Sequence, residues 1–356
     1  MAREPVTIKD VAKKAGVAIS TVSSVINGNE KHVGSATRDR ILQVARDLNY
    51  RPNAIARSMV KRTTTSIGLV ITDVQNPLFN EVDAGVEEVL AAEGYHLLLA
   101  NAMNASSEAE AIETFRSKQV DGFIFMSRSR YYPTHNFASL KADNIPFVVI
   151  NRDMQDSEIN QVLLDDFGAG LISTRHLISL GHTRIATIAG PLRDQPVWRS
   201  AHERHRGWRQ AMQEKGLPVR EDWIIPCRYT YEAGYNAARQ LIEQNPDKAT
   251  RPSAIFAAND SMAVGAMKAL QEMGLRLPQD MAIVGVGDLP HLAYLHPSLT
   301  TMSIPIFEAG RVATRLLINW IKNGKPDCAQ NVTLSCTLKI RESCGSALLN
   351  PVSNRA

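Results

Sequence analysis

The sequence predicts two parts, an N-terminal all-α helix-turn-helix headpiece and an α/β core of two doubly wound subdomains. Three observations support this fold class: a basic N-terminal segment, two short helical patterns joined by a glycine, and an alternation of strands and helices after them. Residues 1–62 contain 12 Lys and Arg against 5 Asp and Glu, whereas the rest of the 356 residues contain 28 against 31. A basic head on a mildly acidic body is typical of a polyanion-binding module attached to another domain.

The helix-turn-helix is expected near the N-terminus. Thr7 and Asp10 have the spacing of a capping box, in which a hydroxyl N-cap is followed three positions later by an acidic residue. Gly16 suits the turn that ends this first helix, and residues 19–27 form a second helical pattern. Two short helices joined by a tight turn are what a helix-turn-helix requires.

Two further elements follow the helix pair. A third helix is expected over 36–49, with Ser35 as its candidate N-cap, and it would close a small three-helix core. Pro52 then starts a new element that Asn53 can cap. The basic segment over 53–60 is too short for a stable isolated helix, so we expect it to become ordered only when another surface packs against it.

The body of the chain alternates between apolar strands and helices. This alternation predicts parallel sheets that are covered by helices on both faces. Ligands in such folds bind at the carboxyl ends of strands, so a cleft between the two subdomains is the expected binding site. The expected strands are 66–72, 95–101, 122–127, 147–151, 161–164, 184–189, 254–257 and 282–285, and the expected helices are 78–93, 107–118, 169–180, 201–215, 231–245 and 261–273.

Composition and motifs argue against several classes of protein. The four cysteines form no CxxC pair, which indicates free thiols in a reducing compartment. The N-terminus lacks the apolar region of a secretory signal, and no apolar run approaches the ~20 residues of a membrane span, so we expect a cytoplasmic protein. The nine histidines lack metal-site spacing, and no phosphate loop or nucleophile elbow is present. We therefore expect no metal, no cofactor and no enzymatic activity.

Motifs spread over nearly the whole chain resemble one known family. The stretch TIKDVAKKAGVAISTVSSVINGN, followed by ATRDRILQVARDLNYRPNAIARSM, resembles the LacI/GalR family of bacterial repressors. Further matches are SIGLV, NPLF, VDG, LGH, ND, LPQD and PSLTT, which begin at residues 66, 76, 120, 180, 259, 277 and 297. The resemblance implies that the core is similar to the type I periplasmic sugar-binding proteins.

The resemblance also implies how the chain is divided. It places a headpiece at 1–50, a hinge helix and linker at 51–64, and an effector-binding and dimerisation core at 65–346. Within the core, the N-subdomain is expected at about 65–164 and 302–326, and the C-subdomain at about 165–301 and 327–346.

The second helix of the headpiece would lie in the major groove of DNA, where the resemblance implies that Ile19, Ser20 and Ser24 read base edges. Two residues depart from the family. Ser24 replaces a frequent Arg or His and cannot make a bidentate contact with guanine, and Ala18 replaces a frequent serine. For Thr21 and Ser23, a plain solvated helix surface is the alternative to a phosphate contact. The residues suited to phosphate are Thr7, Thr21, Ser23 and Asn27.

Residues 53–60 resemble the family's hinge helix, which folds on operator DNA, pairs with its dimer mate and inserts an apolar side chain into the minor groove. Met59 matches the inserted residue, which is usually Leu, and it is apolar enough to unstack a base step. The alternative is that Met59 is only a packed helix residue. The hinge residues expected at the DNA are Asn53, Ala56, Arg57 and Met59.

A small polar effector, either a sugar or a nucleoside-like molecule, would bind between the core subdomains. Arg204 matches the family's ligand-binding arginine, whose planar fork suits a hydroxyl pair or a carboxylate. Phe79 and Tyr229 match aromatic residues at the ligand. Trp198 is expected to cover the cleft or, alternatively, to pack on the surface. Polar residues at strand ends complete this expected site: Asp73, Arg152 and Asn259.

One position of the effector site departs from the family. Relatives usually carry an acidic residue that grips sugar hydroxyls, and here Gly287 occupies that position, followed by Asp288. Either a loop shift brings Asp288 into the site, or the ligand is held in another way.

The expected function is that of a dimeric transcriptional repressor, which reads near-palindromic DNA and responds to its effector. The short tail over 348–356 lacks the heptads of a tetramerising coil, which favours a dimer. A sugar-binding protein of a transport system would explain the core but not the basic head, and it would need an export signal. A sugar-modifying enzyme would need a catalytic set that the sequence does not offer.

Overall fold

The computed structural model describes residues 6–28, 33–51, 63–72, 74, 78–126, 135–152, 154, 158–192 and 198–346. The chain divides into two compact units, Met1–Thr65 and Ser66–Ala356. The first unit is a helical headpiece and the second is an α/β core with two sheets, so the expected fold class is confirmed. The expected hinge segment at 53–60 lies outside the described residues.

The headpiece contains the three expected helices, α1 (Ile8–Ala15), α2 (Ile19–Ile26) and α3 (Ser35–Asp47). At the start of α1, the backbone N–H and the hydroxyl of Thr7 donate to the Asp10 carboxylate over 2.8 and 2.7 Å. Gly16 follows α1 with φ at +67°, a left-handed conformation that costs glycine little. The predicted capping pair and the predicted turn are therefore both present.

One predicted cap in the headpiece is wrong. Gly34, and not Ser35, is the N-cap residue of α3, because Ser35 already has helical geometry. The Gly34 carbonyl accepts a hydrogen bond from the Arg38 N–H over 3.0 Å, which closes the first turn around Ser35. Between the three helices, Val11, Val22 and Ile41 are fully buried and form the centre of the headpiece core.

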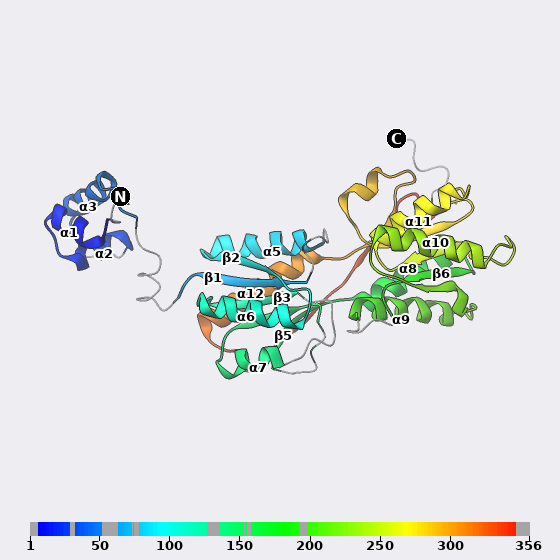
Figure 1. The fold of residues 1–356 in the computed structure, drawn as a ribbon, viewed down its shortest axis with the longest axis horizontal. Helices are drawn as coiled ribbons and strands as arrows, with labels where there is room; N and C mark the ends of the chain where they lie inside the picture. The colour runs from blue at the N-terminus through cyan, green and yellow to red at the C-terminus, as the bar shows by residue number, and fades with distance from the viewer. Residues whose placement is uncertain are drawn as a thin grey trace. The chain divides into compact units, whose positions relative to one another are not determined.

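The first sheet of the core has six strands, and helices cover both of its faces (Figure 1). Its strands are β1 (Ser66–Ile71), β2 (His96–Asn101), β3 (Gly122–Met126), β4 (Phe147–Ile150), β5 (Asn160–Leu164) and β11 (Asn331–Leu334). Its helices are α5 (Leu78–Glu93), α6 (Ala105–Ser117), α7 (His135–Ala142) and α12 (Ile306–Asn323). The order is β11-β5-β4-β3-β1-β2, and all neighbouring pairs are parallel.

Alternation along β1 explains why this sheet is covered on both sides. Successive side chains of a strand point to opposite faces. Ile67 and Leu69 pack in one hydrophobic cluster with α5 and α12, whereas Val70 packs in another with α6 and α7.

The second sheet also has six strands. Its strands are β6 (Ile185–Ala189), β7 (Ile224–Pro226), β8 (Ala254–Ala257), β9 (Ala282–Gly287), β10 (Thr300–Ser303) and β12 (Thr337–Lys339). Its helices are α8 (Asp166–Ser179), α9 (Arg199–Glu214), α10 (Tyr231–Gln244) and α11 (Asp260–Glu272), with short 3-10 turns η1 (Glu221–Trp223) and η2 (Pro290–Tyr294).

The strand order of the second sheet is β12-β10-β9-β8-β6-β7, in which only β12 runs antiparallel to its neighbour among the described pairs. Phe256 of β8 packs in a cluster with α8 and α9, whereas Ile255 packs with α10 and α11. The same period of two therefore covers both faces of this sheet as well.

The chain passes between the two sheets at three places: from β5 to α8, from β10 to α12, and from β11 to β12. These crossings correct the expected subdomain limits. Strand β11 belongs to the first sheet, although 327–346 was assigned to the C-subdomain, and β10 extends to Ser303 in the second sheet. The reason is that β11 pairs with β5 at the edge of the first sheet, and the chain then crosses to the second sheet, where β12 pairs with β10.

Several elements were not predicted from the sequence, namely α7, α12, β7, β10, β11, β12 and both 3-10 turns. Of the helices in the described ranges, none is both long and apolar enough to cross a membrane. All four cysteines are free, as predicted.

Candidate functional site

The second headpiece helix, α2, has one buried side and one exposed side. Val22 and Val25 are buried against the other helices, whereas Ser20 is exposed and Ile19 leaves 45% of its surface accessible. An exposed isoleucine at the start of a short helix gains nothing for the headpiece core, so it is available for contact with another molecule. At the N-cap, Ala18 makes no side-chain hydrogen bond to the helix, since alanine has no oxygen to offer.

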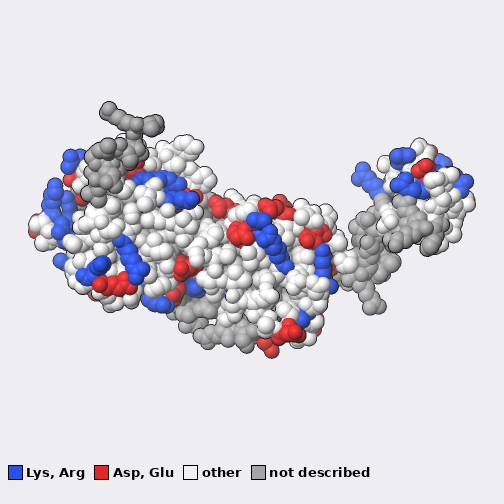
Figure 2. Space-filling view, turned by 180° about the vertical axis from the view of Figure 1, so that it is seen from behind, with Lys and Arg blue, Asp and Glu red and all other residues white. Residues whose placement is uncertain are grey.

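The other headpiece residues expected at DNA are all at least partly exposed. Thr21, Ser23 and Ser24 are half-exposed, and Thr7 is exposed. The side-chain amide of Asn27 donates to the Ser23 carbonyl over 2.8 Å and thereby closes the end of α2. On the visible face of the headpiece, basic side chains outnumber acidic ones, whereas the two kinds are interleaved over the core (Figure 2). The hinge residues Asn53, Ala56, Arg57 and Met59 lie outside the described residues.

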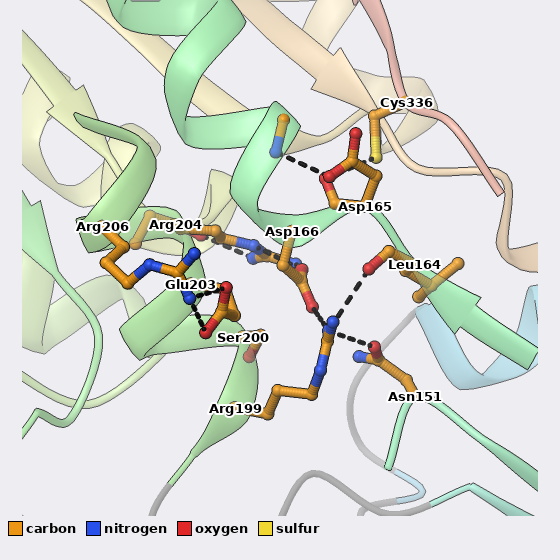
Figure 3. A network of polar contacts seen from close by, with 12 residues as sticks. Asn151, Leu164, Asp165, Asp166, Arg199, Ser200, Glu203, Arg204, Arg206 and Cys336 are labelled. Carbon is orange, nitrogen blue, oxygen red and sulfur yellow. Dashed lines mark hydrogen bonds and ion pairs between the residues drawn. The ribbon is translucent and has the colours of Figure 1, made fainter. Parts of the chain in front are cut away.

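A buried polar network joins the two sheets of the core (Figure 3). At its centre is Asp166, the first residue of α8, whose side chain is fully buried. One carboxylate oxygen accepts from Nε of Arg204 over 2.9 Å and pairs with its Nη2 over 2.8 Å. The other oxygen accepts from Nη1 of Arg199 over 2.8 Å. Two guanidinium groups of α9 therefore share one carboxylate.

Both arginines also reach the carboxyl ends of strands. Nη1 of Arg199 donates to the Leu164 carbonyl, at the end of β5, over 3.2 Å and to Oδ1 of Asn151, just after β4, over 3.3 Å. Nη1 of Arg204 donates to the Ala258 carbonyl, just after β8, over 2.6 Å. The network therefore connects the strand ends of the first sheet with a strand end of the second, where ligands of α/β folds are bound.

Arg204 was predicted from the resemblance, and the structure places it in this network. Burial is the largest single influence and disfavours its charged form, but the charge and hydrogen bond of Asp166, together with smaller contributions from Tyr229 and Cys336, raise the pKa of Arg204 above its ordinary value. Nε and Nη2 of Arg204 both contact Asp166. The two parallel hydrogen bonds that we expected Arg204 to donate to a ligand are therefore donated to a protein carboxylate.

Two aromatic residues lie beside the network. The rings of Trp198 and Tyr229 meet edge to face with centroids 5.6 Å apart. The Tyr229 hydroxyl lies 3.4 Å from the hydroxyl of Ser200, next to Arg199 on α9. The two expected aromatic ligand contacts of the C-subdomain are thus brought together with Arg204.

Arg152 and Phe79 have other surroundings than expected. Arg152 is buried, and its Nη1 pairs with Glu108 over 3.1 Å while its guanidinium lies 4.6 Å from the Phe137 ring centroid. Phe79 is also buried and packs in the hydrophobic cluster of α5 and α12. Arg152 is engaged inside the N-subdomain because α6 and α7 supply a carboxylate and an aromatic ring that sequence spacing did not reveal.

Of the remaining expected residues, Asn259 caps a helix and Asp288 is ion-paired. Oδ1 of Asn259 accepts from the Met262 N–H over 2.9 Å at the start of α11. Oδ1 of Asp288 accepts from Nη2 of Arg341 over 2.6 Å. The Asp288 carboxylate therefore has a cationic partner in place. Asp73 lies outside the described residues.

The buried carboxylate of Asp260 explains why position 287 holds a glycine and not the acidic residue usual in relatives. Asp260 is buried, and its Oδ2 accepts from the Asp288 N–H over 2.6 Å, while its Oδ1 accepts from the Thr301 hydroxyl over 2.6 Å. Burial raises the pKa of Asp260 to about 6. A Cβ on Gly287 would lie 2.6 Å from Oδ2 of Asp260, and Gly287 has φ at +149°. The loop is therefore built around Asp260, with no space for a side chain at 287.

The sequence reading missed Asp166 and Arg199. A signal for Asp166 was present, since an acidic pair directly follows the strand predicted at 161–164. Arg199 carried no such signal, because its role depends on α9 approaching the ends of β4 and β5. Among the described residues, no cluster of three or more His, Cys, Asp or Glu side chains could hold a metal ion.

Comparison with known proteins identifies both units. Residues 7–53 match the bacterial regulatory proteins of the lacI family, and residues 174–344 match a periplasmic binding protein-like domain. Catabolite control protein A of Priestia megaterium is 33% identical over 95% of this chain and 99% of that protein. The chain belongs to the LacI family.

Solved structures of LacI-family proteins agree with this assignment. A transcriptional regulator CelR–cellobiose complex is 31% identical, with a TM-score of 0.70 over 95% of this chain and 99% of that one. The lac repressor dimer bound to operator and the anti-inducer ONPF is 25% identical, with a TM-score of 0.84 over 96% of this chain and 99% of that one. The family match includes the headpiece, which the alternative of a transport protein left unexplained.

One half-buried histidine of the core predicts a pH effect on stability. Burial lowers the pKa of His205 to about 4 from an ordinary value of 6.5, with Arg209 adding to the effect. The His205 ring stacks on Trp208 with centroids 5.4 Å apart. As the pH falls from 6.5 to about 4, the unfolded chain takes up this proton before the folded one, so the folded state loses stability over that window.

His205→Phe keeps the ring but removes the titration. We expect urea unfolding at pH 7.5, 5.5 and 4.5 to show a shallower acid loss for this variant than for the wild type. The control is His96→Phe, at an exposed strand position, which should follow the wild-type curve. Parallel acid curves for wild type and His205→Phe would contradict the prediction.

Proposed function

We propose that this protein is a transcriptional repressor that acts in the cytoplasm as a homodimer and binds near-palindromic operator DNA. Its operator affinity is set by a small polar effector, a sugar or nucleoside-like molecule, bound between the core subdomains. The observation that carries the proposal is the exposed Ile19 and Ser20 side of α2 on a basic headpiece. The lac repressor dimer on operator DNA and the CelR–cellobiose complex support it by similarity.

In this proposal α2 enters the major groove, and the hinge around Met59 enters the minor groove. The effector favours one arrangement of the two subdomains. That arrangement changes how the hinge segments of a dimer pair and thereby changes the affinity for operator, with a typical coupling of ~1–3 kcal/mol. The residues proposed to contact DNA are Thr7, Ile19, Ser20, Thr21, Ser23, Ser24, Asn27, Asn53, Ala56, Arg57 and Met59.

The deciding experiment is a footprint of the purified full chain on DNA upstream of its own coding region, with and without sugars and nucleosides. We expect a protected near-palindrome of two half-sites about one helical turn apart. Absence of protection under every condition would overturn the proposed function.

Two variants separate affinity from sequence preference. Met59→Gly should weaken operator binding roughly 10- to 100-fold, because it removes the apolar wedge. Ser24→Arg should mainly change the preferred bases, because arginine can make the bidentate guanine contact that serine cannot. Selection of binding sites from a random DNA pool, followed by titration, measures both effects. Ser179→Arg, which adds the same side chain to an exposed core position, should change neither.

A further inference from the structure

The network around Asp166 has unequal charge. Its contacts join two guanidinium groups to one carboxylate, and the other acceptors, the carbonyls of Leu164 and Ala258 and the amide of Asn151, are neutral. The Arg204 and Arg199 side chains leave only 7% and 13% of their surface exposed. Holding a guanidinium away from water without a compensating charge is costly.

Among the described residues, the acidic side chains nearest in sequence to Asp166 and Arg199 have other partners. Oδ1 of Asp165 accepts from the Gly168 N–H over 2.7 Å and caps α8. Both carboxylate oxygens of Glu203 accept from Nη1 of Arg206, over 2.8 and 2.7 Å, on the outer side of α9. Figure 3 shows both carboxylates directed away from Arg199. Neither one therefore balances the second guanidinium.

Arg199 retains a donor for a further acceptor. Its Nε is buried and makes no hydrogen bond within the part of the chain that the structure describes. Arg199 is also the first residue of α9, whose N-cap position is held by Trp198 without a side-chain hydrogen bond to the helix. The N-terminus of a 16-residue helix carries partial positive charge and favours an anion.

We propose that the effector carries an anionic group, a carboxylate or a phosphate, which binds beside Arg199 at the start of α9 and balances the charge of the Asp166 network. The proposal rests on the proposed effector site and names the chemical class of its ligand. A neutral hydroxyl would use the free Nε donor but would leave the excess charge in place. An anion supplies both the acceptor and the charge.

The position of Arg199 gives this binding event a consequence for the fold. Arg199 holds Asn151 and Leu164 of the first subdomain while α9 belongs to the second. An anion at the free Nε of Arg199 bonds to the same guanidinium whose Nη1 makes those contacts. Binding therefore acts directly on the hydrogen bonds that join the two subdomains.

The first test is thermal unfolding of the full chain in inorganic phosphate and in chloride at matched ionic strength. We expect phosphate to raise the Tm of the wild type by about 2–4 °C more than chloride. Arg199→Met should lose this difference, and Arg199→Lys should keep part of it. Arg206→Met removes the same charge from an exposed position of the same helix and should respond like the wild type. General stabilisation by phosphate acts on all four proteins alike and is cancelled in the comparison.

The second test distinguishes the source of the charge by comparing glucuronate and ribose 5-phosphate with neutral glucose and ribose. Stabilisation by an acidic member over its neutral partner, lost in Arg199→Met, supports the proposal and shows whether carboxylate or phosphate is preferred. Equal responses of wild type and Arg199→Met to phosphate and to every sugar would overturn it. Operator footprinting of the same wild-type preparation tests the proposed repressor function separately. The proposed anionic effector can therefore be refuted while the repressor function stands, and the reverse also holds.

Discussion

Asp166→Asn is expected to lower the free energy of unfolding of the core by about 3–5 kcal/mol, the cost of breaking a buried ion pair by removing one partner. The substitution preserves the shape of the side chain but leaves Arg199 and Arg204 without their shared carboxylate. Urea titration followed by tryptophan fluorescence measures the loss, since Trp208 on α9, the helix that carries both arginines, is fully buried.

The matched control is Glu214→Gln. Glu214 also accepts two hydrogen bonds from one arginine, Arg175 at 2.9 Å each, but Arg175 is 52% exposed and Glu214 is 32% exposed. Its loss should cost less than about 1 kcal/mol, as is usual for surface pairs. Adding Arg199→Met to Asp166→Asn should recover part of the lost free energy of unfolding, because it removes one buried guanidinium that has no carboxylate partner. Equal effects of the two carboxylate substitutions would show that the Asp166 network does not stabilise the core.

Gly287→Asp, which restores the acidic residue usual in the family, is expected to destabilise the core by roughly 3 kcal/mol or more. Its Cβ would lie 2.6 Å from Oδ2 of Asp260, and its carboxylate would enter a loop that already holds Asp260 and Asp288. The positive φ of +149° adds strain for any side chain. Unfolding by urea and the yield of folded protein both measure this effect.

Gly324→Asp is the control that separates backbone strain from the steric clash with Asp260. Gly324 also has a positive φ, at +91°, but a Cβ there would meet nothing within 4 Å. We expect a cost of about 1 kcal/mol at this position, from backbone conformation alone. If the two glycine substitutions cost the same, the crowding around Asp260 is not what excludes an acidic residue from position 287.

The loop at Gly287 and the arginine pair on α9 both favour an effector with negative charge. The acidic grip usual in relatives is absent at Gly287, and Asp288 is paired with Arg341. On α9, two guanidinium groups converge where one carboxylate is available. The absence of an acidic side chain at position 287 and the presence of a second guanidinium at position 199 both favour an effector with negative charge over a neutral sugar, for the same electrostatic reason.

Local signals were sufficient for the parts of the fold that depend on neighbours in sequence. Thr7 with Asp10 and the left-handed Gly16 act within one helical turn, so their pattern predicted the start and end of α1. Apolar runs predicted most central strands, because a parallel strand buried on both faces leaves little choice of residue. The edge strand β11, with an alternating and partly exposed pattern, lacked such a run.

The sequence by itself determined the helix-turn-helix, the alternating core and the family, since each depends on short-range spacing or on motifs in order. Only the tertiary structure decided how the polar side chains pair. Arg152 turns to Glu108, Arg199 and Arg204 share Asp166, and Asp260 occupies the space beside Gly287. Spacing along a chain does not report which buried charges meet, because that depends on how distant helices and strand ends pack together.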